Sequence, residues 1–313
     1  MTERDQFDRL DALIDAILTD RAVPVVDADL AAVALIAADL RDLSDPRFRD
    51  RLRNEFEKEN NMQTTTTTAT HLYPYFLIDG ASGFIEFLEK AFDAEVVLSV
   101  PDPSGKVMHA EVRIGDSVIE MGDAGGRWTS RTPPLHVYVP DVDDVYRRAL
   151  AAGATSMYAP MDQPYGDREA GVVDSFGTEW FLATRLEGGA RPEGFGTVTA
   201  TLRAEGAVRL IEFLAQAFGA IEIERTSGPS GEIRHAEVKV GATMVEVSEA
   251  HGQWKPTTGA FHLFVDDCDA MYERALRAGA TSVMPPEDKP YGERSAAIDD
   301  PFGNQWYIAT PIG

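Results

Sequence analysis

The stretch LHVYVPDVDDVYRRALAAGATS at residues 135–156 occurs a second time, in altered form, as FHLFVDDCDAMYERALRAGATS at 261–282. The two copies lie 126 residues apart. The same offset separates HAEVRIGDSVIEMGD at 109–123 from HAEVKVGATMVEVSE at 235–249, QPYGDR from KPYGER, and DSFGTEWFLAT from DPFGNQWYIAT. Because loops change length faster than cores, this constant offset predicts two copies of one domain that keep nearly the same fold.

Each copy shows the same succession of short strands and amphipathic helices. In the first copy HLYPYFLID at 71–79 reads as a strand, and GFIEFLEKAF at 83–92 carries apolar residues at helical spacing. Three strands with turn signals follow, and then a second such series, whose helix is capped by Asp141 or Asp143. The pattern predicts two βαβββ modules in each copy and an α+β fold class.

The repeats also indicate the domain boundaries. We expect a helical segment over 1–61, a threonine-rich linker over 62–70, a first domain over 71–186, a linker over 187–196 and a second domain over 197–313. A threonine run has no apolar face to bury, which is typical of a linker. The helical segment is either an interaction module for a protein partner or for self-association, or it packs on the repeats.

The composition excludes several classes of protein. A net charge of −23 argues against nucleic acid or an anionic membrane surface as partner. The single cysteine, Cys268, allows no intrachain disulfide and no thiolate metal cage, and Val142 at the matching position predicts a small helix-entry residue. No basic signal-peptide start and no run of ~20 apolar residues is present, so we expect a cytoplasmic protein.

The succession of modules resembles a known superfamily. Two βαβββ modules in series, LHVYV leading a helix, and a DPFG hairpin ending in a strand resemble the vicinal-oxygen-chelate (glyoxalase/bleomycin-resistance/dioxygenase) superfamily. The stretches KVMHAEVRIGDSVIEM at 106–121 and PEDKPYGERSAAIDDPFGNQWYIAT at 286–310 resemble its PhnB-like branch. The resemblance implies tandem glyoxalase-like domains, each forming a curled-sheet cup, and it leaves the activity open because the superfamily hosts enzymes and drug-binding proteins alike.

Metalloenzymes of this superfamily hold their ion with residues of the first, fourth, fifth and last strands. The resemblance places the fourth-strand carboxylate on Glu120 and Glu246, and the fifth-strand histidine on His136 and His262. The two outer positions lack metal-binding side chains in both copies and fall on Tyr73, Thr199, Phe181 and Tyr307. Each copy is therefore expected to keep half of the set, whereas a firm divalent-metal site usually takes three or four protein ligands.

A predicted hairpin adds further charged residues to the cup. VRIGDSVI at 112–119 reads as two strands joined by a Gly-Asp turn, and pairing outward from that turn places Glu111 opposite Glu120. Alternation places His109 and Arg113 on the same face. The opposite, apolar face must pack on the helices, so the charged face lines the cup. The second copy repeats the arrangement with His235, Glu237, Lys239 and Glu246.

Opposed carboxylates repel each other and need compensation. A metal ion, a shared proton, the nearby Arg113 or Lys239, or water could supply it. In a functional interpretation His109 or Glu111 completes a rearranged metal site, with Glu179 as an extra ligand that Gln305 replaces in the second copy. In the alternative interpretation the charged strand is only a solvated polar face.

Aromatic and arginine side chains are further candidates for ligand contacts. Trp128 and Trp254, with the YGDR and YGER loops, could close over a planar or anionic guest. These loops supply Tyr165, Arg168, Tyr291 and Arg294. Trp180 and Trp306 are expected in the core, and His71 and His251 on the surface.

Three functions remain open. The first is a protein that binds a small organic molecule in its cups, favoured by the aromatic residues at the outer ligand positions. The second is a lyase, isomerase or dioxygenase with zinc, nickel, manganese or iron as Lewis acid, and with Glu111 or Glu237 moving the proton. The third is a regulatory protein that senses a ligand and contacts a partner through residues 1–61.

Overall fold

The computed structural model describes residues 70–186 and 191–312, and both repeats carry the same elements in the same order. The helical segment expected over 1–61 and most of the linker expected over 62–70 lie outside the described residues. The first repeat contains β1 (His71–Ile78), α4 (Ala81–Phe92), β2 (Glu95–Pro101), β3 (Val107–Ile114), β4 (Ser117–Asp123), β5 (Leu135–Tyr138), α5 (Val142–Ala151), β6 (Thr155–Asp162), β7 (Asp167–Val173) and β8 (Glu179–Arg185). The second contains β9 (Val198–Ala204), α6 (Ala207–Phe218), β10 (Ile221–Ser227), β11 (Ile233–Val240), β12 (Thr243–Glu249), β13 (Ala260–Phe264), α7 (Cys268–Arg277), β14 (Thr281–Lys289), β15 (Glu293–Asp299) and β16 (Gln305–Pro311).

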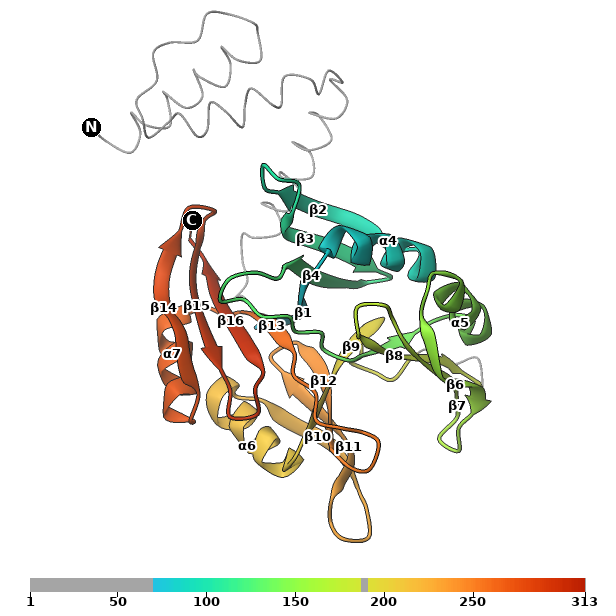
Figure 1. Ribbon diagram of the computed structural model, residues 1–313. Helices are drawn as coiled ribbons and strands as arrows, with labels where there is room; N and C mark the ends of the chain where they lie inside the picture. The colour runs from blue at the N-terminus through green and yellow to red at the C-terminus, as the bar shows by residue number, and fades with distance from the viewer. Residues whose placement is uncertain (1–69, 187–190, 313) are drawn as a thin grey trace, which may run out of the picture. The chain divides into compact units, whose positions relative to one another are not determined.

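The strands form two eight-stranded sheets, and each sheet takes four strands from each repeat (Figure 1). One sheet runs β14-β15-β16-β13-β1-β4-β3-β2, and the other runs β10-β11-β12-β9-β5-β8-β7-β6. The repeats join where β1 pairs antiparallel with β13 and where β5 pairs antiparallel with β9. The α+β class with two βαβββ modules per repeat is confirmed. Each module leaves its first strand as an open edge, and pairing with the other repeat covers that edge.

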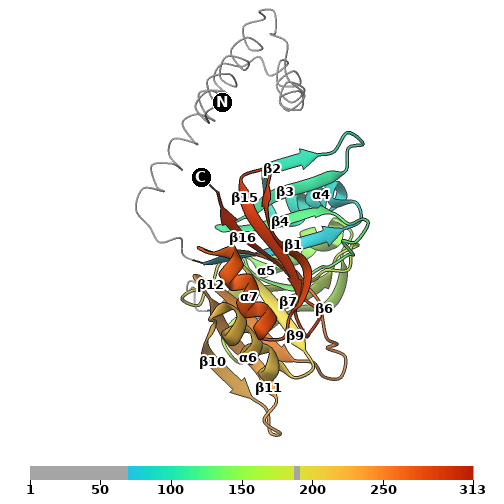
Figure 2. The ribbon, with the colours of Figure 1, turned by 90° about the vertical axis from the view of Figure 1, so that its left-hand side faces the viewer.

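The apolar cores, in contrast, form within each repeat. Trp180 on β8 is fully buried and packs against Phe92 of α4, with ring centroids 4.6 Å apart, and Trp306 packs in the same way on Phe218. Helix α4 contacts α5 (Figure 1), and α6 contacts α7 (Figure 2). The expectation that both tryptophans belong to the core is confirmed. In each repeat the two helices therefore pack between that repeat's own two modules. The other face of each sheet is built from strands of both repeats.

A smaller expectation, for Cys268, is also met. Cys268 is buried at the start of α7, and its thiol donates to the carbonyl of Ile308 at 3.2 Å. Burial raises the pKa of the thiol to about 12, so it is not a reactive thiolate. Among the described helices none is long and apolar enough to cross a bilayer. A cytoplasmic location stays a prediction.

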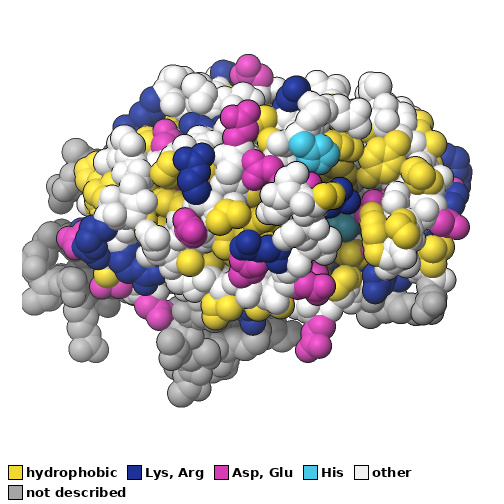
Figure 3. All heavy atoms as spheres, turned by 90° about the horizontal axis from the view of Figure 1, so that it is seen from below, with side chains coloured by type: hydrophobic (Ala, Val, Ile, Leu, Met, Phe, Trp, Pro, Cys, Tyr) yellow, Lys and Arg dark blue, Asp and Glu magenta, His cyan; other side chains and the backbone are white. Residues whose placement is uncertain are grey.

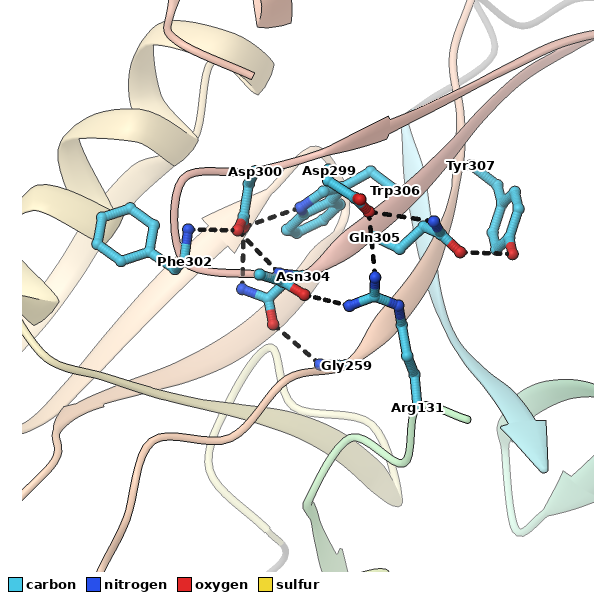
Figure 4. A network of polar contacts seen from close by, with 10 residues as sticks. Arg131, Gly259, Asp299, Asp300, Phe302, Asn304, Gln305, Trp306 and Tyr307 are labelled. Carbon is cyan, nitrogen blue, oxygen red and sulfur yellow. Dashed lines mark hydrogen bonds and ion pairs between the residues drawn. The ribbon is translucent and has the colours of Figure 1, made fainter. Parts of the chain in front are cut away.

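The hairpin between β15 and β16 is held by one buried carboxylate (Figure 4). Oδ1 of Asp300 accepts from the backbone N–H groups of Phe302 and Asn304, at 2.8 and 2.9 Å. Its Oδ2 accepts from the indole of Trp306 at 3.0 Å and from the Asn304 side chain at 2.9 Å. Asp174 makes the corresponding bonds to Trp180 and the backbone in the first repeat.

Replacing Asp300 by Ala is expected to lower the free energy of unfolding by about 2–4 kcal/mol, because four donors lose one buried acceptor. Urea denaturation followed by circular dichroism measures the change. Asp266→Ala, at an exposed aspartate before α7, is the control and should stay within about 0.5 kcal/mol of the parent. Equal effects of the two substitutions would contradict the role of Asp300 in holding the hairpin.

Candidate functional site

The predicted Glu and His residues come together, but across the repeats. Nδ1 of His136 on β5 lies 2.8 Å from Oε1 of Glu246 on β12, and Nδ1 of His262 on β13 lies 2.7 Å from Oε2 of Glu120 on β4. The expected pairing of Glu120 with His136 inside one repeat is wrong, because β5 pairs with β9 and so lies in the same sheet as β12, whereas β4 belongs to the other sheet. We call the face that carries Glu120 and His262 the first cup, and the face that carries Glu246 and His136 the second cup.

Each pair is buried, and the carboxylate favours the charged form of its histidine. Burial by itself lowers the pKa of His136, but the adjacent Glu246 carboxylate outweighs it, so the pKa lies above its ordinary value. Burial likewise raises the pKa of Glu246, and His136 more than reverses this, leaving it below its usual range. The pKa of His262 is raised in the same way, against burial, by Glu120. The imidazole therefore donates from Nδ1 to the carboxylate.

The opposed carboxylates are confirmed in both repeats. Glu111 faces Glu120 between β3 and β4, and Glu237 faces Glu246 between β11 and β12. Histidines compensate their repulsion. Nε2 of His109 lies 3.5 Å from Glu111, and Nε2 of His235 lies 4.0 Å from Glu237, whereas Arg113 pairs with Glu95 on the neighbouring strand.

A further, partly buried carboxylate of the second cup, that of Glu169, was not predicted from the sequence. Oε1 of Glu169 on β7 lies 3.8 Å from Nε2 of His136, a nitrogen that is buried without a hydrogen-bond partner. Burial raises the pKa of Glu169, and the neighbouring Glu246 and Asp167 carboxylates add to this. Alternation along GDREAGVV could have indicated it, since Glu169 and Gly171 share one face of β7. Ser295 stands at the matching position of the other repeat.

A cleft of about 1170 Å³ opens over the second cup. In the space-filling view from below, histidine side chains, one of them recessed, lie among hydrophobic and charged side chains (Figure 3). The predicted residues that line the cleft are His136, Tyr165, Phe181, His235, Glu237, Glu246 and Trp254. His251, expected on the surface, is exposed and also borders this cleft.

One wall of the cleft is built on Arg203 of β9, which the sequence analysis did not single out. Its guanidinium is 4% exposed, donates to Glu179 at 2.7 Å, and lies 5.2 Å from the ring centroid of Trp254 and 5.9 Å from that of Phe181. The ion pair with Glu179 fixes the Arg203 guanidinium, and the guanidinium in turn supports the rings of Trp254 and Phe181. Glu179 is thereby an ion-pair partner of Arg203, and not the extra metal ligand that it was expected to be.

The arginines of the YGDR and YGER loops lie elsewhere. Arg168 donates to Asp143 at 2.6 and 3.0 Å and to Asp162 at 2.7 Å, and Arg294 bonds Asp269 and Asp288 in the same way. Neither is available to hold an anionic guest, because two carboxylates already occupy each guanidinium fork. Tyr165 of the same loop does line the cleft, and Tyr291 is 68% exposed.

The predicted aromatic residues of the first cup are close together. Trp128 and Tyr307 have ring centroids 5.5 Å apart, and Tyr73 meets Phe264 at 5.9 Å with an edge-on ring. Tyr75, two residues beyond Tyr73 on the same face of β1 and opposite Glu120, has its ring centroid 5.1 Å from that of Tyr307. The sequence analysis assigned the first-strand position to Tyr73 and therefore overlooked Tyr75.

The comparisons with known proteins agree with this architecture. The family model for the glyoxalase/bleomycin resistance protein/dioxygenase superfamily matches residues 79–182 and 197–308. The chain belongs to this superfamily. An uncharacterized protein of Mycobacterium bovis is 40% identical over 124 residues, which cover 36% of this chain and 80% of the relative. Assignment of this superfamily member to the PhnB-like branch stays a prediction.

Solved structures show the same superfamily fold across both repeats. Glyoxalase I from Zea mays is 14% identical with a TM-score of 0.57, over 77% of this chain and 93% of that one. A putative dioxygenase from Bacillus subtilis is 14% identical with a TM-score of 0.51, over 79% of this chain and 86% of that one. At such identities the likeness concerns the fold alone.

The candidate metal-binding side chains of this superfamily member do not fit a firmly held divalent ion. The carboxylate of Glu246 bonds directly to His136, and Thr199 and Phe181 stand at the two outer positions. Within residues 70–186 and 191–312 no three His, Cys, Asp or Glu side chains are grouped so that they could share one ion. Firm sites take three or four protein ligands, so we derive no chemical step through a metal.

Protein incubated with nickel, zinc, manganese or iron(II) and then desalted is expected to retain less than about a tenth of an equivalent of metal. Elemental analysis measures the retained ion, with His136→Ala/His262→Ala as the matched variant. A stoichiometric ion in the parent that is lost in this variant would contradict the expectation and would favour the metalloenzyme.

Proposed function

We propose that this chain binds a small organic molecule in the cleft of the second cup, and that the guest combines an aromatic plane with a positively charged group. The observation that carries the proposal is a cleft lined by aromatic side chains, in which the partly buried carboxylates of Glu169 and Glu237 form no ion pair with an arginine or lysine among the described residues. Binding is favoured over metal-dependent catalysis, because the candidate metal-binding side chains do not fit a firmly held metal ion.

The walls of the cleft suit a planar guest. Phe181 and Trp254 lie on one side with ring centroids 5.9 Å apart, and Tyr138 and Tyr158 are further lining residues. Aromatic faces carry negative partial charge, so they attract cations as well as other rings. A cleft of this size can bury most of a drug-sized molecule.

The charges of the cleft favour a cation. The lining guanidinium of Arg203 is paired with Glu179, and that of Arg185 lies 2.8 Å from Asp167. The third lining arginine, Arg234, is exposed and lies 3.9 Å from Glu232. Glu169 and Glu237 have only histidine as an ion-pair partner among the described residues, and burial raises the pKa of both. An ammonium or other cationic group beside them would lower these pKa values and so stabilise the ionised carboxylates.

Berberine, a planar aromatic cation with strong fluorescence in apolar sites, is a direct probe of the proposal. We expect saturable binding by fluorescence titration and calorimetry, and weak or no binding of the planar anion anilinonaphthalene sulfonate. Glu169→Gln should weaken berberine binding about tenfold, since it removes a buried charge from the cleft. Saturable binding of the sulfonate in preference to berberine would overturn the proposed guest class.

The general acidity of the chain could also attract cations, so the control must change the charge equally. Glu89→Gln removes one exposed carboxylate from α4, outside the cleft lining. It should leave berberine affinity within about twofold of the parent, because exposed charges are screened by salt. Equal weakening by both substitutions would show only long-range attraction and would contradict a site in the cleft.

A further inference from the structure

We infer that the two cups differ in function: Tyr75 closes the first cup, so that only the second cup takes the guest. The inference rests on the proposed function for the identity of the guest. It makes Tyr75 the residue that sets how many ligand sites the chain has.

Aromatic rings form an unbroken row across the first cup. The ring centroids of Trp128 and Tyr307 are 5.5 Å apart, those of Tyr307 and Tyr75 are 5.1 Å apart, and Tyr75 stacks on His109 at 6.0 Å. Tyr75 also meets the edge of His262 at 6.4 Å. Its ring therefore covers the Glu120–His262 pair from above.

The floor beneath Tyr75 is adapted to its ring. A Cβ added at Gly122, two residues after Glu120 on β4, would lie 3.3 Å from the Tyr75 hydroxyl and 2.8 Å from the backbone oxygen of Met108. Glycine at 122 leaves the space in which the phenol end of the ring rests. The large side chain of Tyr75 and the absence of a side chain at Gly122 are therefore complementary in shape.

The second cup reverses this choice at both positions. The repeat offset places Thr201 where Tyr75 stands and Ser248 where Gly122 stands, and both residues line the cleft. The hydroxyl of Thr201 donates to Glu246 at 3.0 Å and does not reach across the cup. The row Trp254–Phe181 consequently ends at Thr201, and the space occupied by Tyr75 in the first cup is part of the cleft.

A chain of polar contacts that links the two repeats also restrains the closed cup. Arg131 lies 3.3 Å from Asp299, which accepts from Gln305 at 3.1 Å, and the hydroxyl of Tyr307 donates to Gln305 at 2.9 Å (Figure 4). Tyr307 is thus fixed beside Tyr75. Phe181, its counterpart in the second cup, has no hydroxyl for such a bond.

The first measurement is the berberine stoichiometry of the full chain by calorimetry. The parent should bind about one equivalent and Tyr75→Thr/Gly122→Ser about two, because the opened cup keeps its acidic and aromatic lining. Thr201→Tyr/Ser248→Gly should lose saturable binding. Tyr272→Thr, on α7 with its hydroxyl bonded to Ser282, is the matched control and should keep about one equivalent.

The second measurement does not depend on the guest. Free p-cresol reproduces the tyrosine side chain, and it should raise the Tm of Tyr75→Thr by refilling the vacated space. It should leave the Tm of the parent and of Tyr272→Thr unchanged. Two berberine equivalents in the parent, or no cresol rescue of Tyr75→Thr, would overturn the inference. Cresol rescue without berberine binding by any variant would overturn the proposed function alone.

Discussion

Glu246→Ala is expected to lower the free energy of unfolding by about 3–5 kcal/mol, as measured by urea denaturation at neutral pH. The substitution leaves His136 buried, with its Nδ1 proton unpaired and its Nε2 already without a partner. A charged imidazole is costly in that position, so its pKa should fall once Glu246, the main group that opposes the effect of burial, is removed. Proton NMR of the His136 ring in the variant measures that fall.

The pH dependence of the same variant gives an independent check. The raised pKa of His136 contributes stability that is complete below about 6.5, its unfolded value, and is lost as pH rises through the folded value. The lowered pKa of Glu246 contributes stability that is present above about 4.3 and is lost as pH falls through the folded value. Glu246→Ala should remove the slope that belongs to Glu246 and flatten or reverse the slope that belongs to His136. Unchanged slopes would contradict a buried ion pair.

Arg203→Ala is expected to cost about 2–4 kcal/mol of unfolding free energy and to abolish saturable berberine binding. The guanidinium supports Trp254 and Phe181 and neutralises the partly buried Glu179, so its loss leaves the rings unsupported and the carboxylate unpaired. Thermal and urea denaturation measure the first effect, and calorimetry measures the second.

A double-mutant cycle with Glu179→Gln separates the ion pair from the packing. The double variant should recover part of the stability, because no carboxylate remains unpaired, but it should not recover binding. Arg147→Ala, whose exposed ion pair with Asp144 contributes little, serves as the control and should stay within about 0.5 kcal/mol of the parent. Full binding by Arg203→Ala would contradict its role in the cleft wall.

The features predicted correctly from the sequence are those set by local pattern. The repeat offset predicted two copies of one fold, and the hairpin register predicted Glu111 opposite Glu120 because a two-residue turn leaves only one pairing. Trp180 alternates with cup-facing Phe181 and so had to lie in the core. Each of these features depends only on residues that are close to one another in the sequence.

The pairing of Glu120 with His262 could not be obtained in that way. Each half-sheet has the same pattern of apolar and charged faces, so the hydrophobic alternation is satisfied whichever repeat supplies the partner strand. The contact between β1 and β13 joins residues far apart in the sequence and leaves no local signal. The role of Arg168 was also predicted wrongly, because Asp143 on the preceding helix already forms an ion pair with its guanidinium.

The division of each sheet between the two repeats has a consequence for how this chain can change over time. If two identical subunits met in this manner, every substitution would appear in both cups, and a residue that closed one would close the other. In a single chain the codons for Tyr75 and Thr201 mutate separately, although their side chains hold corresponding places. One cup is then free to become scaffold, because the other still serves the guest and the shared strands keep both in register.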